Sequence, residues 1–203
     1  MTYFKYFLAP FLVLVLVLAH NDQGNAQAQS TYAFDQENSS IHMYGSSNYA
    51  DWDTSVGIND AEITVGELNE LSAEIIQDLS FNMPVTEIDG DDERLNENIY
   101  YYLEQEEHPY ITFELIEVLE IGERENNSFD ITAVGEIEAA GVADQIELTA
   151  QANLQADDSI RIQGEHELLM TDFDIEPPTA MMGAIVAEDW VRVEFDVTLI
   201  PDQ

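Results

Sequence analysis

The chain has 203 residues, of which 45% are hydrophobic and 10% aromatic, and this apolar supply argues against a disordered protein. It carries 42 acidic and only 5 basic residues, a formal net charge of −37 at pH 7, which disfavours nucleic-acid binding because phosphate contacts need basic patches. The sequence contains no cysteine, which excludes disulfide bonds, a lipid-modified cysteine and thiolate chemistry.

The first 28 residues have the pattern of a secretory signal peptide. Lys5 precedes the apolar run 6–19, and Ala26-Gln27-Ala28 offers small residues where signal peptidase prefers them. The apolar run is shorter than the roughly 20 residues that a membrane-spanning helix needs. We therefore expect residues 1–28 to be removed, leaving no stable membrane span, and residues 29–203 to form one domain in the periplasm or outside the cell.

The acidic residues are spread evenly from Asp35 to Asp202, and every basic residue after the predicted leader is an arginine. Like charges on such a surface repel over about 10 Å at 0.1 M salt but only about 3 Å at 1 M. We favour adaptation to concentrated salt over a surface that captures cations or basic partners. Against this acidic background a pair of carboxylates is no evidence of acid–base catalysis, and we expect the run Asp89–Glu93 to be a turn before a helix rather than a calcium site.

Most of the chain after the leader alternates apolar and polar residues with a period of two, which is typical of β-strands with one solvent-exposed face. The clearest segments are 75–85, 111–115, 129–131, 146–148, 160–162 and 191–199. Turn signals at 121–123, 125–127 and 156–158 lie between them. Many short strands with short connections predict an all-β protein with an antiparallel meander.

One segment breaks this period. Leu95, Ile99 and Leu103 are spaced four apart between residues 92 and 105, which is the spacing of one helical face. Asp91 or Asp92 can cap the first turn, and Pro109 prevents the helix from continuing past residue 108. We expect one short helix that covers one end of the sheet.

Three blocks of the sequence, in order, resemble the YceI-like family. Residues 45–52 are similar to the family's Gly-Thr-Ser-x-x-His-Asp-Trp segment, except that Ser46 replaces threonine and Ala50 replaces histidine. The predicted helix and residues 109–113 are similar to its helix and Pro-x-Ile-x-Phe strand. Residues 171–179 are similar to its Thr-Asp-Phe to Pro-Pro-Thr segment. Any role that the missing histidine plays in relatives does not carry over to this chain.

The resemblance implies an eight-stranded, antiparallel, lipocalin-like barrel that binds a polyisoprenoid or another long-chain lipid and performs no catalysis. It implies no metal or other cofactor. Our candidates for the ligand-binding interior are the apolar residues at inward positions: Leu79, Phe81, Phe113, Leu115, Ile131, Leu148, Leu168, Met170, Phe173, Phe195 and Val197. Ordinary core packing is the alternative for each of them. We expect the two tryptophans, Trp52 and Trp190, to plug a barrel end.

Two other functions stay open at this stage. One is a structural or interaction barrel whose interior is packed solid. The other is a hydrolase assembled from distant parts of the chain, although no Gly-x-Ser-x-Gly motif is present. The histidines after the leader, His42, His108 and His166, have no ligand-like spacing, so we expect no metal centre. The sequence leaves the identity of the lipid and the oligomeric state open.

Overall fold

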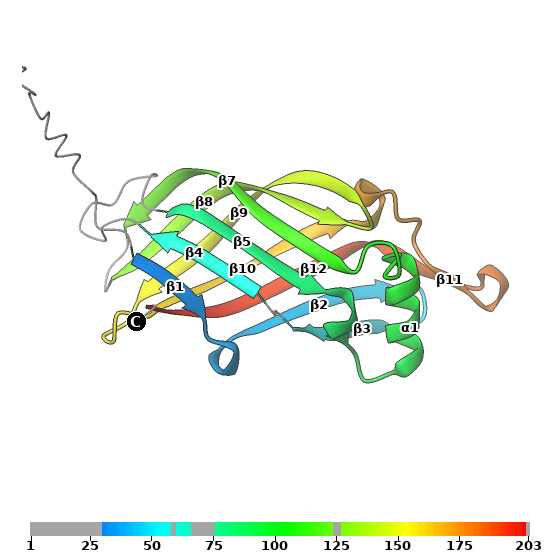
Figure 1. Ribbon diagram of the computed structural model, residues 1–203. Coiled ribbons are helices and arrows are strands. Elements are labelled where there is room, and N and C mark those ends of the chain that lie inside the picture. The colour runs from blue at the N-terminus through cyan, green and yellow to red at the C-terminus, as the bar shows by residue number, and fades with distance from the viewer. Residues whose placement is uncertain (1–29, 58–59, 66–75, 124–126, 202–203) are drawn as a thin grey trace, which may run out of the picture.

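The structure is a computed structural model that describes residues 30–57, 60–65, 76–123 and 127–201 (Figure 1). The predicted signal peptide lies outside the described residues. Within those residues, none of the helices has the length and apolar character needed to cross a bilayer.

The described residues form twelve β-strands and one α-helix, and these strands are antiparallel in every pairing. The strands are β1 (Ser30–Phe34), β2 (Ser40–Ser47), β3 (Asp51–Val56), β4 (Asp60–Val65), β5 (Ile76–Pro84), β6 (Ile88–Asp89), β7 (Tyr110–Glu123), β8 (Ser128–Ala139), β9 (Val142–Leu154), β10 (Ile160–Leu169), β11 (Thr179–Ala180) and β12 (Ile185–Pro201). The helix is α1 (Glu93–Tyr102), and the short 3-10 helices are η1 (Gln36–Asn38), η2 (Val85–Glu87), η3 (Met170–Phe173) and η4 (Met181–Gly183).

The sheet curls into a barrel (Figure 1). Strand order runs β1-β4-β5-β7-β8-β9-β10-β12, and β12 returns to pair with β1. Toward the other end of the barrel, three strands continue the paths of three others: β2 continues β1, β3 continues β4, and β6 continues β5. We call each such pair of strands a course. In this part of the barrel β2 pairs with β12, β3 with β2 and β6 with β3. The predicted antiparallel barrel with one helix is confirmed. The count of strands exceeds eight because the first three courses are each interrupted, which adds β2, β3 and β6, and because the short β11 pairs with β12.

Local chemistry explains two of the interruptions. Between β1 and β2 the Asp35 carboxylate accepts hydrogen bonds from the backbone N–H groups of Glu37 and Asn38, at 3.1 and 3.4 Å, which turns the chain into η1. Between β5 and β6, Pro84 lacks a backbone N–H and begins η2. Each interruption bends the course without ending the barrel wall.

The wall is nearly rather than fully closed. Strands β9 and β10 pair only from Ala150 to Leu154 and from Ile160 to Gly164, and beyond Gly164 they separate. The segment η3 contacts β9, β10 and β12 near this separation. On the opposite side β5 pairs with β7 only along residues 80–84 and 110–114.

Strand β7 departs from the simple alternation. Two irregularities in its pairing with β8, between Leu115 and Glu117 and between Val118 and Glu120, each shift the register. As a result Leu115 and Val118 both face the interior, while Ile116 and Leu119 are 47% and 46% exposed. The turn predicted at 121–123 is wrong, because these residues extend β7 and pair with residues 129–131.

The predicted helix is confirmed as α1, which lies across one end of the barrel (Figure 1). Asp92 is its N-cap and accepts a hydrogen bond of 2.8 Å from the backbone N–H of Arg94. Asn96 donates to the Asp89 carboxylate at 2.7 Å and accepts from the backbone N–H of Gly90 at 2.8 Å. The acidic run 89–93 therefore forms a turn and a helix cap, as expected.

Two arginines of the described residues pair with acids on the barrel's outer face. Arg161 on β10 donates two hydrogen bonds to Asp196 on β12, one of them 2.7 Å long, and these bonds lower the pKa of Asp196 below its ordinary value. Arg192 lies 3.1 Å from Glu194 and 4.9 Å from the centre of the Tyr44 ring. With 42 acidic residues in the chain, these pairs offset only a small part of the negative charge.

We predict that the barrel becomes more stable as salt concentration rises. Screening shortens the range of repulsion among the carboxylates, from about 10 Å at 0.1 M salt to about 3 Å at 1 M. The thermal unfolding midpoint, followed by far-ultraviolet circular dichroism, should therefore rise between about 0.1 and 2 M KCl. A series at constant KCl with added sucrose separates screening from general solute effects. A midpoint that stays level or falls with KCl contradicts salt adaptation.

Candidate functional site

The barrel encloses a cavity of about 490 Å³. It extends from α1 and the β10–β12 connection, at one end, into the part of the barrel where β1 meets β12. The buried side chains form two hydrophobic clusters, one centred on residues such as Ile88 and Phe113 and the other on residues such as Tyr32 and Leu199. The cavity borders both clusters. Its volume lies within the roughly 300–1,000 Å³ that is typical of ligand pockets.

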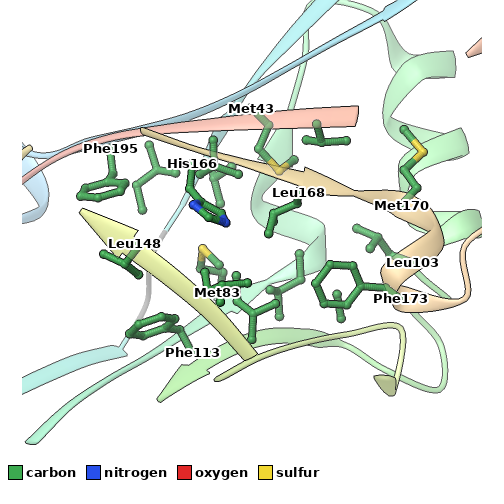
Figure 2. Close-up of a pocket in the computed structure, with 18 of the residues that line it drawn as sticks. Met43, Met83, Leu103, Phe113, Leu148, His166, Leu168, Met170, Phe173 and Phe195 are labelled. Carbon is green, nitrogen blue, oxygen red and sulfur yellow. The ribbon is translucent and has the colours of Figure 1, made fainter. Parts of the chain in front are cut away.

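Strand alternation determines which side chains reach the cavity. On β8 the odd-numbered residues face inward, on β9 the even-numbered ones, and on β12 the odd-numbered ones. All eleven residues predicted from the sequence lie on the cavity wall: Leu79, Phe81, Phe113, Leu115, Ile131, Leu148, Leu168, Met170, Phe173, Phe195 and Val197. Figure 2 shows several of them converging on a common space. Their role in ligand binding stays a prediction.

Aromatic rings in the wall lie against glycines, which have no side chain to hold the rings away. Phe113 on β7 stacks on Phe81 of β5, with ring centres 4.8 Å apart, and covers Gly135 of β8 so closely that a Cβ there would lie 2.3 Å from its ring. Phe195 on β12 covers its cross-strand partner Gly164 in the same way, at 2.5 Å. These rings therefore lie along the wall.

The two tryptophans differ in position. Trp52 on β3 lines the cavity and covers its cross-strand partner Gly45, where a Cβ would lie 2.0 Å from the indole. Trp190 pairs with Leu169 at the even-numbered, outward-facing positions of β12 and is not part of the cavity wall. Trp190 lies where the pairing of β12 with β2 is irregular, between Ala187 and Val191, and the wall, which includes Val191, gives no support to the expectation that Trp190 plugs a barrel end.

The segment after β10 is fixed to β12 by one threonine. Thr171 donates from its backbone N–H and its hydroxyl to the two carboxylate oxygens of Asp189, at 3.0 and 2.7 Å. This clamp holds η3 in place and directs Phe173, which is 4% exposed, into the cavity end. The Thr-Asp-Phe block that resembles the YceI-like family thus has a structural role here.

The later part of the β10–β12 connection, with β11 and η4, reaches beyond the cavity end. Thr179, Ala180 and Ile185 line the cavity, while Met181 and Met182 between them are 73% and 106% exposed. The methionines therefore project from the rim of the cavity rather than packing into a hydrophobic cluster.

Sequence reasoning missed several wall residues. The cavity is also lined by Met43 on β2, by Leu95 and Ile99 on α1, and by Leu103, the C-cap of α1. Alternation with Ile41 could have identified Met43, but the polar residues around it obscured the pattern. The helix residues were expected to cover the sheet, and they also form part of the cavity wall.

The cavity wall contains few polar groups. The lining within the described part of the chain includes no aspartate, glutamate, lysine or arginine. Its side-chain polar groups belong to Ser47, Trp52, Asn98, Tyr102, His166 and Thr179. Burial lowers the pKa of His166 below the ordinary value of 6.5, because an apolar environment disfavours the charged imidazolium. This shift favours the neutral form of the ring.

One group of potential metal ligands lies away from the cavity. Glu104, Glu107 and His108 place one ligand atom each within 4.8 Å of one another, on the turn after α1. The His108 ring covers Gly141, whose backbone has a φ of +76°, in the β8–β9 turn. This contact accounts for His108 as a packing residue, and acidic groups of this kind are common on an exposed turn.

Comparison with known proteins identifies the family. The model of the YceI-like domain matches residues 32–199, which is most of the chain. BcnA of Burkholderia cenocepacia has a similar structure, with a TM-score of 0.63 and 13% identity over 81% of this chain and 98% of that one. So does a polyisoprenoid binding domain from Saccharophagus degradans implicated in plant cell wall breakdown, with a TM-score of 0.63 and 13% identity over 87% and 99%. No curated protein matches the sequence. The chain belongs to the YceI-like family.

Proposed function

We propose that this protein is an exported binding protein that holds a polyisoprenoid, or a lipid of similar length and slenderness, inside its barrel. The observation that carries the proposal is the cavity of about 490 Å³ with an almost entirely apolar wall. The structural similarity to a polyisoprenoid binding domain supports the same class of ligand. We propose no catalytic role.

The energetics favour a long chain over a small molecule. Each methylene transferred from water to an apolar site contributes about 0.8 kcal/mol, so ten buried carbons contribute about 8 kcal/mol. Association costs about 4–15 kcal/mol, which a small apolar molecule does not offset. A barrel of about eight strands is just wide enough for one slender ligand, and this width disfavours bulky ring systems.

The alternatives receive less support. A barrel with a solidly packed interior would have no cavity of this volume. A hydrolase needs a nucleophile beside a base, and His166, the histidine of the described cavity wall, has no serine or carboxylate hydrogen-bonded to it within the described residues.

We predict that the protein retains an apolar lipid through gentle purification. The full chain would be expressed with its leader, purified in concentrated salt without detergent, and extracted with organic solvent for mass spectrometry. We expect about one isoprenoid or other long-chain lipid per protein, because release exposes the chain to water. Extracts with no lipid above the level of an unrelated exported protein, together with no binding of added isoprenoids, contradict the proposal.

The export step predicts a defined mature N-terminus. Cleavage after Ala28 would leave Gln29 as the first residue of the secreted or periplasmic form. Cell fractionation and N-terminal sequencing of the native product check both location and cleavage site. An Ala28→Arg variant should accumulate unprocessed, because signal peptidase requires a small residue there. A cytoplasmic product with an intact leader contradicts export.

Room for a ligand should depend on the glycines that the aromatic rings cover. A methyl group at Gly164 would meet the Phe195 ring and also approach the backbone oxygen of Thr149, at 3.1 Å. The ring would then have to swing into the cavity. By contrast, a methyl group at Gly122 on β7 meets nothing closer than 3.9 Å.

We predict that Gly164→Ala weakens binding of geranylgeraniol, a 20-carbon isoprenoid alcohol, by about tenfold. Overpacking of this kind typically costs about 1–3 kcal/mol, and about 1.4 kcal/mol corresponds to a factor of ten. Displacement of bound fluorescent retinol measures the affinity, and thermal unfolding shows whether the variant is folded. Gly122→Ala serves as the matched control and should bind as the unaltered protein does. Equal affinity in a folded Gly164→Ala protein contradicts the predicted role of this wall.

A further inference from the structure

One polar side chain lies well inside the otherwise apolar cavity. His166 is on β10, where residues 162, 166 and 168 face inward, and it pairs with Val193 of β12, which pairs in turn with Met43 of β2. Figure 2 shows its ring pointing into the cavity among Met43, Leu148 and Leu168. The position is part of the binding wall, beyond the point where β9 and β10 separate at Gly164.

The imidazole forms no hydrogen bond or ion pair with any other described residue. The half-buried ring faces the cavity, where a ligand that displaces water has to replace its hydrogen bonds, because an unpaired buried group costs about 1–3 kcal/mol. Packing does not require histidine here, since leucine, isoleucine or methionine occupies the comparable positions around it. The unpaired imidazole therefore points to a partner that comes from inside the cavity.

The other polar groups of the wall differ in this respect. The Ser47 hydroxyl donates to the backbone oxygen of Ala50 at 2.9 Å, within the β2–β3 turn. Asn98 and Thr179 are exposed, and Tyr102 lies on α1 with Asn98, at the end of the barrel. Ser47 therefore has a partner and Asn98 and Thr179 reach water, whereas the His166 ring points into the cavity between apolar side chains.

The chemistry of His166 narrows the class of its partner. A neutral imidazole has one N–H donor and one nitrogen acceptor, so it can donate to a carbonyl or exchange hydrogen bonds with a hydroxyl. The described wall has no lysine or arginine to balance a carboxylate or phosphate. Burying such an unpaired anion costs far more than burying a neutral oxygen.

We propose that His166 recognises a neutral oxygen, a hydroxyl or a carbonyl, on a ligand that is otherwise hydrocarbon. This inference rests on the proposed lipid-binding function and refines it. The barrel selects oxygen-bearing isoprenoids over plain hydrocarbons of the same length, and it excludes an anionic headgroup from its interior.

The test compares two ligands that differ by one hydroxyl: geranylgeraniol and the corresponding hydrocarbon that lacks it. Retinol displacement gives both affinities for the unaltered protein, for His166→Leu, and for His166→Gln, which keeps a donor and an acceptor. We expect the alcohol-to-hydrocarbon affinity ratio to fall about five- to tenfold in His166→Leu and to stay largely intact in His166→Gln. The solubilities of the ligands cancel, because only the change of ratio between proteins is used.

His42→Leu is the matched control, since His42 on β2 lies outside the cavity wall and its loss should leave the ratio unchanged. A measurement on the unaltered protein needs no substitution: ¹⁵N shifts of the His166 ring should move on adding the alcohol and not on adding the hydrocarbon. An unchanged ratio in a folded His166→Leu protein that binds both ligands, or equal ring shifts with both, overturns the role of His166. If the unaltered protein binds neither ligand, the proposed function itself fails.

Discussion

Closure of the sheet through β12 is the constraint on which the rest of the structure depends. This strand pairs with β10 along one edge and with β2 and then β1 along the other, so both of its edges are hydrogen-bonded. Closure leaves no long unpaired edge at this seam, and unpaired edges promote association between chains. It also gives every strand an inner face, and the side chains on these faces have only each other or a ligand to contact.

The inner face stays open because of how its largest residues are placed. Rings that extended across the barrel would fill it, yet Trp52, Phe113 and Phe195 lie against glycines of neighbouring strands. Because these glycines have no side chain, the bulky rings can lie flat along the wall. The same geometry gives a physical reason for the Gly45 to Trp52 block, where the glycine and the tryptophan are cross-strand partners.

The sequence predicted the fold and the cavity wall where a period of two was uninterrupted. On β12 the alternation is strict, and the inward residues Phe195 and Val197 follow from it directly. On β7 the two register shifts changed which face Ile116 and Leu119 occupy, and shifts of this kind depend on pairing with β8 that no local pattern reveals. The interruptions of the first three courses were not predicted for a similar reason. Short polar strands such as β2 show only a weak alternation of apolar and polar residues.

His166 was missed although the signal was present. Its position differs by two from the predicted wall residue Leu168, so the same alternation places it inward. Treating histidines only as possible metal ligands concealed this, because metal sites are recognised by spacing between ligands. A polar residue at an inward-facing position of a predicted apolar strand face is a more informative signal than the spacing between histidines.

Alternation also separates the charged outer surface of the barrel from its apolar cavity wall. On β12 the outward residues Arg192, Glu194 and Asp196 form ion pairs at the surface, while Val193 and Phe195 between them face the cavity. Because neighbouring residues of a strand face opposite sides, acidic residues can accumulate outside without changing the shape or charge of the interior. The solvent therefore contacts the outward-facing residues, while the inward-facing residues line the cavity. A barrel of this kind can change the charge of its surface while keeping an apolar interior.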